Sequence, residues 1–199
     1  MAPKPIAVEQ ERASKRRNQV LEAAARCFRL YGFHGSSMAQ LAKEAGMSVG
    51  HIYHYFENKE AIIDAIVQKD LDEWLASIQH LLNSSNIFED MLAQLDDPIR
   101  DWLDPDYAAL QIEILAEAAR NAKVVAIVRA SHDKIRDTVG ELLRKGSSRP
   151  LTQTEIDSKF DLIGALCDGL MVRAIHSGTL DRDNLLALLR PTIRFILEY

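Results

Sequence analysis

The sequence is poor in the residues that interrupt secondary structure. Its 199 residues include only 9 glycines and 6 prolines, so the segments between breaks are long, as helical proteins require. Its longest apolar stretches, such as residues 162–167, are far shorter than the roughly 18 residues that a membrane span needs. We find no convincing pair of strands and no internal repeat. These absences predict an all-α protein with no membrane partner.

The first residues have no features of an export signal, and the sequence contains only two cysteines. Residues 1–8 hold two prolines and a lysine, but no apolar stretch of about 7 residues or more, which a secretory signal needs. The two cysteines, Cys27 and Cys167, lie far apart at positions typical of helix faces. This spacing favours buried thiols over a disulfide framework or a zinc site. Redox sensing is the alternative and would need an exposed thiol of low pKa. We expect a cytoplasmic protein with no metal and no cofactor.

The net charge of −5 is unevenly distributed. Residues 1–60 carry nine Lys or Arg and six Asp or Glu, whereas residues 61–199 carry fifteen and twenty-three. The tightest basic cluster is Lys15, Arg16 and Arg17, with Arg12 one turn earlier. A basic end on an acidic body is typical of a protein that docks one end onto a polyanion. On charge alone, a solvated helix face is the alternative.

Apolar periodicity and capping residues predict about nine helices. From Arg12 to Tyr31 the apolar residues follow the spacing of an amphipathic helix, which Gly32 ends. Ser37 and Ser48 can cap two short helices that follow. The remaining helices are expected at 58–83, 87–95, 105–119, 121–145, 152–177 and 181–199, with a break at Asp97-Pro98 and a bend or delayed start because of Pro191.

The stretch from Gly32 to Glu60 has the spacing of a helix-turn-helix motif, with Ala45-Gly46-Met47 as the turn. In such a motif the first helix braces the second, whose first residues reach base edges in the major groove. No Asp, Glu, Lys or Arg occurs between Ala45 and Phe56. Base contacts must then come from His, Ser, Tyr and apolar groups. The candidates for the outer face are Ser48, Val49, Gly50, His51, Tyr53, His54 and Tyr55.

A combination of fixed positions surrounds this motif over about residues 14–64. It comprises Gly32-Phe33-His34-Gly35-Ser36-Ser37-Met38, Leu41-Ala42, Ala45-Gly46-Met47-Ser48-Val49-Gly50, Ile52-Tyr53-His54-Tyr55-Phe56 and Asn58-Lys59-Glu60-Ala61-Ile62. This combination resembles the DNA-binding domain of TetR-family transcriptional regulators. The resemblance implies a helix-turn-helix domain at residues 1–60 and a helical effector-binding and dimerisation domain at 61–199. It also implies a homodimer on a near-palindromic, double-stranded DNA operator, most often a repressor that a small-molecule effector releases.

Carried over position by position, the resemblance assigns residues to DNA contacts. Ser37 and Gln40 would touch the DNA backbone or flanking bases, and Lys59 would anchor a phosphate. Val49 and His51 stand where many relatives have longer polar or basic groups. Six further residues would face the groove or would contact base edges and phosphates: Ser48, Val49, Gly50, His51, Tyr53 and His54.

The C-terminal half resembles the family more weakly, through residues 113–121 and Asp168-Gly169-Leu170. The family architecture implies an effector pocket among the fourth to eighth helices and a four-helix dimer interface from the last two helices of each subunit. Aromatic residues interleaved with isolated polar groups indicate pocket positions, with ordinary core packing as the alternative. The pocket candidates are Trp74, Trp102, Tyr107, Gln111, Glu117, Met171, Arg173 and His176. The interface candidates are Ile163, Leu166, Leu170, Leu186, Leu189 and Ile193.

Other functions find less support in the sequence. His51 and His54 are spaced like a metal-binding pair, but no third ligand stands nearby. Ser131-His132-Asp133 holds the residue types of a catalytic triad, yet adjacent residues on a helix point in different directions. We find no paired acid and base, phosphate loop or metal cluster, so we expect no enzyme. The alternatives to a regulator are a helical enzyme and a helical adaptor whose basic end is incidental.

Overall fold

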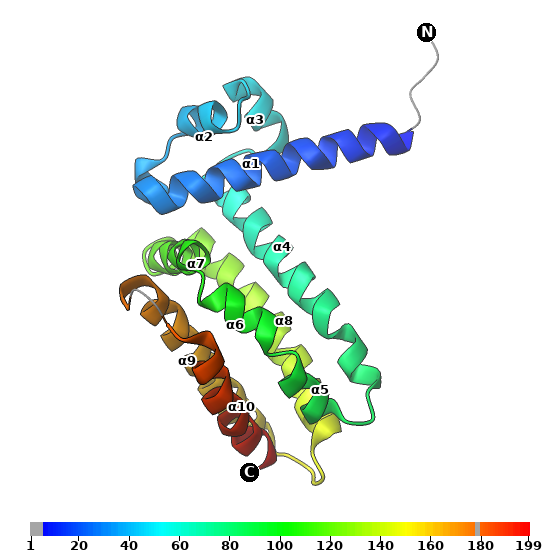
Figure 1. The fold of residues 1–199 in the computed structure, drawn as a ribbon. Helices are drawn as coiled ribbons and strands as arrows, with labels where there is room; N and C mark the ends of the chain where they lie inside the picture. The colour runs from blue at the N-terminus through cyan, green and yellow to red at the C-terminus, as the bar shows by residue number, and fades with distance from the viewer. Residues whose placement is uncertain (1–5, 178–179) are drawn as a thin grey trace. The chain divides into compact units, whose positions relative to one another are not determined.

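The structure, a computed structural model, describes residues 6–177 and 180–199, which are helical and contain no strand (Figure 1). The elements are α1 (Ile6–Gly35), α2 (Met38–Glu44), α3 (Val49–Tyr55), α4 (Lys59–Ile78), the 3₁₀ helix η1 (Gln79–Asn83), α5 (Ile87–Ala93), α6 (Asp96–Trp102), α7 (Pro105–Ala118), α8 (Ala122–Gly146), α9 (Gln153–His176) and α10 (Arg182–Glu198). The all-α prediction is confirmed, and ten α-helices in the described residues are close to the predicted nine. None of these helices is both long enough and apolar enough to cross a membrane.

By its internal contacts the chain divides into two compact units. The first unit contains the described residues up to Gln68 and residues 113–127, and the second contains 69–112 and 128–199 as far as they are described. The division falls inside α4, α7 and α8, so it does not separate two continuous stretches of sequence. The domain boundary after residue 60 stays a prediction.

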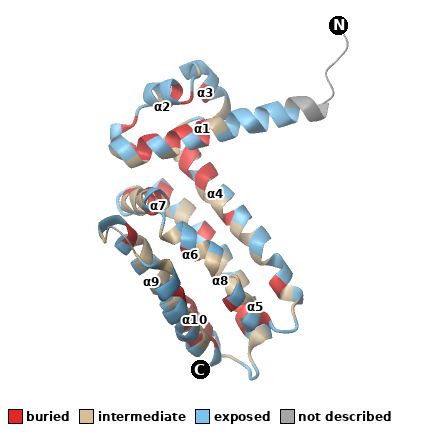
Figure 2. Ribbon diagram, viewed as in Figure 1, coloured by how far each residue is buried: buried red, intermediate tan, exposed pale blue. Residues whose placement is uncertain are grey.

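The first unit has a closed apolar core. The apolar stripe of α1 is buried along Val20, Leu21, Ala24, Cys27 and Phe28, as its helical periodicity predicts. The other buried residues of the first unit include Leu41 and Ala42 from α2, Ile52 from α3, Phe56, and Ile62 and Ile63 from α4 (Figure 2). Burial of these large side chains fixes the two short helices, which are too short to be stable alone.

The second unit packs its core between α5, α8, α9 and α10. One cluster of buried residues joins Leu92, Leu143, Ile156, Ile193 and Leu197, and a second joins Leu81, Ile87 and Leu142. At the end of α8 a Cβ atom on Gly146 would lie 2.7 Å from the Phe88 ring carbon Cδ1. Only glycine therefore lets α8 and α5 approach this closely.

Three local features differ from the helices expected at the outset. The expected break at Asp97-Pro98 is wrong, because α6 begins at Asp96. Pro98 stands in the first turn of α6, where a backbone N–H has no partner within the helix. The helix from residue 58 tightens into η1 after Ile78. Pro191 lies inside α10, which begins directly after its cap Asp181, so its start is not delayed.

Candidate nucleic-acid interface

Side-chain caps hold the starts of α2 and α3. Ser37 and Gln40 form a reciprocal capping box: the Gln40 amide donates to Ser37 Oγ at 3.2 Å, and the Ser37 amide donates to Gln40 Oε1 at 2.7 Å. Ser48 Oγ accepts a hydrogen bond from the His51 amide at 3.2 Å and caps α3. Between the helices, Gly46 has a φ of 62°, a conformation that favours glycine. These contacts fix where α3 begins.

The two faces of α3 have opposite environments. Ile52 is completely buried, whereas Tyr53 is 52% exposed. Tyr55 has its ring centroid 5.4 Å from that of His51 and 5.2 Å from that of His54. These contacts hold both imidazoles against a half-buried ring. The other residues predicted to contact DNA from this motif, namely Ser37, Gln40, Ser48, Val49, Gly50, His51 and His54, are also exposed.

Lys59 is engaged inside the first unit. Its ammonium donates to the carbonyl of Phe33 and, at 2.8 Å, to the carbonyl of Ser36. Its Nζ also lies 4.2 Å from the centroid of the Phe33 ring. Burial lowers the pKa of Lys59. The ammonium thus ties the start of α4 to the end of α1, and only its third hydrogen is left for a phosphate.

Polar contacts also attach α1 to α2. Gln19 Nε2 donates to the carbonyl of Ala45, the first residue of the turn of the motif, at 2.7 Å. One and two turns further along the same face of α1, Ala23 is buried and Arg26 Nε lies 2.7 Å from Glu44 Oε1. α1 therefore braces the helix that carries the turn, and through it the start of α3.

The last turn of α1 is held by α7. Gly32 interrupts the helix with a φ of 73°, as the sequence predicts for a helix end at this residue. Directly after it, the amide of Phe33 donates to Glu113 Oε1 at 2.6 Å. A Cβ atom on Gly32 would lie 3.2 Å from the same oxygen. A glycine is therefore required here both by the backbone conformation and by the closeness of Glu113.

Glu117, a predicted pocket residue, lies in this first unit. Its side chain is 1% exposed, and its carboxylate lies 3.0 Å from His34 Nε2. It accepts hydrogen bonds from Arg120 Nε and Asn121 Nδ2, both at 2.9 Å. Burial raises the pKa of Glu117, but the hydrogen bond from Asn121 and the charges of His34 and Arg120 outweigh it, so the pKa is lowered. Glu117 is thus an ionised link between α7 and the end of α1.

The other predicted pocket residues belong to the second unit. Tyr107 and Gln111 come together around Asp70, a residue that the sequence analysis missed: Gln111 Nε2 donates to Asp70 Oδ2 at 2.9 Å. Burial, followed by the charges of Asp70 and Asp101, raises the pKa of Tyr107 to about 12. Burial also raises the pKa of Asp70. Trp74, Trp102 and Met171 are half-buried, and Arg173 and His176 are exposed.

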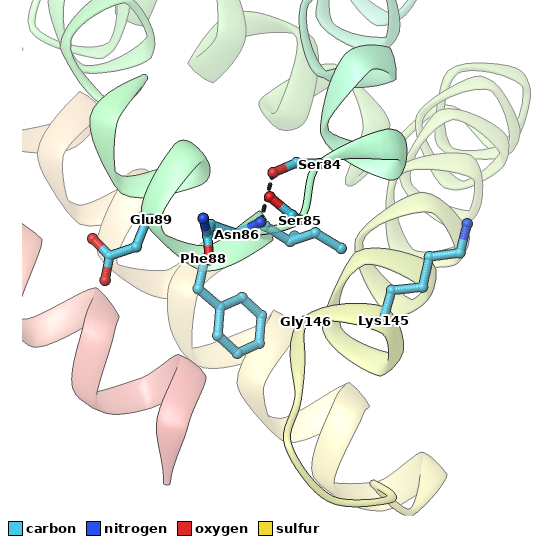
Figure 3. Close-up of a pocket in the computed structure, with 8 residues that line it drawn as sticks. Ser84, Ser85, Asn86, Phe88, Glu89, Lys145 and Gly146 are labelled. Atoms are coloured by element: carbon cyan, nitrogen blue, oxygen red, sulfur yellow. Dashed lines mark hydrogen bonds between the residues drawn. The ribbon is translucent and has the colours of Figure 1, made fainter.

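A pocket of about 200 Å³ lies elsewhere in the second unit, where the segment before α5 meets the end of α8 (Figure 3). Its lining includes Ser84, Asn86, Phe88 and Lys145 and none of the predicted pocket residues. Ser84 Oγ accepts a hydrogen bond from the Asn86 amide at 2.8 Å and donates to the carboxylate of Asp90 at 2.5 Å. The serine hydroxyl is therefore used in shaping the loop.

The predicted interface residues lie mostly inward. Leu186 and Ile193 are buried, Ile163 packs against the core, and Leu166, Leu170 and Leu189 are half-buried. A second set of large apolar side chains on these helices is exposed: Leu162, Val172, Ile175, Leu188, Phe195 and Tyr199. A groove of about 320 Å³ lies beside Leu162, Phe195 and Tyr199. These residues are not among the predicted interface residues, although the i, i+7, i+11 spacing of Leu188, Phe195 and Tyr199 is visible in the sequence.

The remaining candidates from the sequence are the two cysteines and the Ser131-His132-Asp133 stretch. Burial raises the pKa of Cys27 and raises that of Cys167 to about 12, which disfavours the reactive thiolate. Ser131 is buried, and the ring of His132 lies 5.0 Å from that of Phe160. Among residues 6–177 and 180–199, no three His, Cys, Asp or Glu residues are grouped to hold a metal ion.

Comparison with known protein families covers most of the chain. A sequence profile described as "Bacterial regulatory proteins, tetR family" matches residues 20–66. A second, described as "BetI-type transcriptional repressor, C-terminal", matches residues 91–198. The HTH-type transcriptional regulator UidR of Escherichia coli (strain K12) is 31% identical over 166 residues, which cover 80% of this chain and 84% of UidR.

Solved structures show the same fold. GusR from Salmonella enterica superimposes with a TM-score of 0.75 at 24% identity, covering 92% of this chain and 95% of GusR. A transcriptional regulator from Saccharomonospora viridis, in complex with choline, superimposes with a TM-score of 0.67 at 19% identity, covering 91% of this chain and 96% of that protein.

Proposed function

The chain belongs to the TetR family of bacterial transcriptional regulators, and from this premise we propose that it is a homodimeric repressor whose α3 reads a near-palindromic operator. The chain is a DNA-binding regulator of the helix-turn-helix type. Repression is supported by the BetI-type repressor profile over residues 91–198. A dimer of identical reading heads binds two half-sites related by the same two-fold symmetry.

The observation that carries the proposal is the outward face of α3. Its first turn is fixed by the Ser48 cap, and Tyr53, His51 and His54 are exposed although Ile52 beside them is buried. No charged side chain of the Asp, Glu, Lys or Arg type occurs on α3. Reading must therefore use imidazole and hydroxyl hydrogen bonds, with Val49 available for a thymine methyl group.

The test starts with operator selection from random duplex DNA by the purified full chain. Fluorescence anisotropy then compares the selected duplex with a scrambled duplex of the same length. Specific affinity is expected to exceed non-specific affinity by about 10³-fold or more. Tyr53→Ala should reduce this ratio by roughly 5-fold to 150-fold, because each lost base contact costs roughly 1–3 kcal/mol. An equal affinity for both duplexes would contradict sequence-specific reading.

Tyr31→Ala provides the matched control for this substitution. Tyr31 is 58% exposed on α1, close to the 52% exposure of Tyr53, but it lies outside the helix-turn-helix motif. The control should bind the selected duplex like the unaltered chain. If both variants lost affinity equally, the effect would come from general destabilisation rather than from the assigned DNA face.

The homodimer interface is proposed on the outward faces of α9 and α10. Leu188, Phe195 and Tyr199 repeat at i, i+7 and i+11 and so share one face of α10, and the rings of Phe195 and Tyr199 stack at 5.5 Å. On α9, Leu162 and Val172 are exposed, and a Cβ atom on Gly169 would meet nothing within 4 Å. A second copy would remove this apolar surface from water.

The effector is proposed to bind in the second unit, among the residues near Asp70. Tyr107 and Gln111 supply a hydroxyl and an amide close to a largely buried carboxylate, and a few placed polar groups are typical of a ligand site. A fold neighbour in complex with choline supports screening small molecules. Bound effector would weaken operator affinity only by as much as it prefers the non-binding form. Screening for compounds that lower anisotropy, with Gln111→Leu as the binding-deficient variant, tests this site.

A further inference from the structure

Residues 10–18 of α1 form an exposed helical segment with no buried residue. Helix α1 begins at Ile6, and from residue 10 onward its first buried residue is Val20. Residues 10–18 are all exposed, and Figure 2 shows this stretch as a continuous pale-blue helix. A helical segment with no buried side chain gains little stability from tertiary packing. The segment is therefore not needed to close the core of the first unit.

This segment carries the whole positive excess of the chain's first 60 residues. Residues 10–18 contain Arg12, Lys15, Arg16, Arg17 and one acidic residue, Glu11. In residues 19–60, four basic residues balance four acidic ones. Binding to DNA depends strongly on cations that neutralise phosphates. α3 has no Lys or Arg, and Lys59 uses two of its hydrogens internally, so the start of α1 is the main local source of that charge.

Contacts place these cations beside the helix-turn-helix motif. Arg16 Nη1 donates to Gln19 Oε1 at 2.9 Å, and Gln19 in turn donates to the carbonyl of Ala45 in the turn. Arg12 lies one turn before Arg16 on the same face. On the neighbouring face, Arg17 lies 5.1 Å from the centroid of the Phe56 ring, at the other end of α3. The last cations of this segment therefore lie near the turn of the motif and near the end of α3.

We propose that Arg12, Lys15 and Arg16 form a second DNA contact, which binds backbone phosphates of the duplex next to the groove that α3 enters. The inference rests on the proposed function, because the same duplex occupies both surfaces. Charge complementarity identifies the partner: the segment has a charge of +3, whereas the chain beyond residue 60 has a charge of −8 and repels a polyanion. Phosphate contacts position a protein without reading sequence. The α1 surface thus supplies affinity, and α3 supplies discrimination.

The exposed ion pair within this surface does not prevent phosphate binding. Lys15 Nζ lies 2.7 Å from Glu11 Oε1, and both side chains are mostly exposed. Exposed pairs of this kind contribute at most about 1 kcal/mol and are screened by salt. Lys15 can therefore exchange Glu11 for a phosphate at little cost.

The experiment measures binding of the full chain to a selected operator and to a mixed-sequence 30-base-pair duplex over a salt series. The triple variant R12Q/K15Q/R16Q removes three cations that lie outside the core. Each lost phosphate contact should reduce the slope of log affinity against log salt by about 0.9, so the slope should fall by two to three. Affinity for both duplexes should fall by a similar factor, roughly 10-fold to 100-fold at 0.1 M salt, and the ratio between them should hardly change.

Two further variants make the result specific. The triple variant R129Q/K134Q/K145Q removes the same number of positive charges as R12Q/K15Q/R16Q, but at exposed positions of α8 in the second unit. It should leave the slope of log affinity against log salt unchanged. R12K/R16K retains the charges and should retain the slope, since a phosphate accepts either cation. Circular dichroism should show that all three variants fold.

The outcomes separate this inference from the proposed function. The unaltered chain could discriminate between the duplexes while the R12Q/K15Q/R16Q variant keeps its salt slope. That result would overturn the proposed phosphate contact of α1 and leave the proposed reading by α3 intact. Equal slope losses in the α1 and α8 triple variants would also overturn it, because the effect would then come from net charge. If the unaltered chain binds neither duplex, the proposed function and this inference fail together.

Discussion

The outward faces of α3 and α10 are both exposed, but they differ in chemistry. α3 presents two imidazoles and a phenol, whereas α10 presents Leu188, Phe195 and Tyr199. Water satisfies the polar groups of α3, so that face is stable alone and ready for a polar partner. Apolar area in water costs about 25 cal/mol per Å², so the α10 face is most stable against another protein surface. Exposure therefore has different consequences in the two regions: the α3 face suits the proposed contact with DNA, and the α10 face suits the proposed contact with a second copy of the chain.

The largest effect is expected from charging the α10 face. The double variant L188E/F195E should convert the dimer to a monomer, because two carboxylates would be buried unpaired in the interface. Operator affinity should fall by about 100-fold or more, since the second reading head no longer binds at high effective concentration. Light scattering and anisotropy measure the two effects.

Leu30→Glu is the control for this prediction. Leu30 is 71% exposed on α1, comparable with 69% for Leu188, and the substitution should leave the mass in solution unchanged. A dimer that persists in L188E/F195E would show that the apolar stripe of α10 has another role.

The next effect concerns stability within the first unit. Lys59→Met removes the donor to the carbonyls of Phe33 and Ser36 and should lower the free energy of unfolding by about 2 kcal/mol. Tyr53→Ala, on the exposed face of α3, should change it by less than about 0.5 kcal/mol. Urea denaturation compares the two. A stable Lys59→Met variant that has lost DNA affinity would instead assign Lys59 to phosphate binding alone.

A smaller, pH-dependent effect is expected at Glu117. Its carboxylate is ionised and accepts hydrogen bonds inside the first unit, so its pKa in the folded state lies below the ordinary value of 4.5. A lowered pKa stabilises the fold above the ordinary pKa, and this contribution is lost as the pH falls through the folded-state pKa. Glu117→Gln should therefore cost about 1 to 2 kcal/mol at pH 7, and progressively less below pH 4.5.

Denaturation of both proteins between pH 3 and pH 8 measures this difference. Glu57→Gln, at an exposed position, should show no such profile. A stability difference that is constant over this pH range would mean that the shape of Glu117, rather than its charge, holds α7 to α1.

The smallest effect compares the two capping boxes, Ser37 with Gln40 and Thr152 with Glu155. Ser37→Ala and Thr152→Ala should each lower stability by about 1 kcal/mol. Only Ser37→Ala should also lower operator affinity, because α2 belongs to the DNA-binding motif. Thermal denaturation and anisotropy distinguish these effects. Equal DNA binding by both variants would restrict Ser37 to its capping role.

Much of the fold follows from local sequence signals. The caps at Ser37, Ser48, Thr152 and Asp181 and the helix interruption at Gly32 are all as predicted. Capping depends on a side chain and backbone amides two or three residues away, so the sequence contains the whole interaction. The predicted break at Asp97-Pro98 is wrong because proline is tolerated in the first turn of a helix, where Pro98 lies, and disrupts only the interior.

The candidate site could be predicted only where exposure follows from helical periodicity. With Ile52 buried, the outward positions of α3 are determined. The roles of Lys59 and Glu117 could not be predicted, since their partners lie 26 and 83 residues away in the sequence, at Phe33 and His34. No local pattern distinguishes a lysine that binds phosphate from one that binds the carbonyls at a helix end.

The helices, their caps and an α3 without Lys or Arg next to a basic segment all follow from the sequence, because these features depend on neighbouring residues. Which apolar stripe of α10 belongs to the core follows only from its packing against other helices. Leu186, Ile193 and Leu197 form one stripe, and Leu188, Phe195 and Tyr199 form another, two residues later and on nearly the opposite side of the helix. Both stripes have the same period and similar hydrophobicity. Ile193 and Leu197 of the first stripe pack against Leu143 and Ile156, whereas the second stripe is exposed.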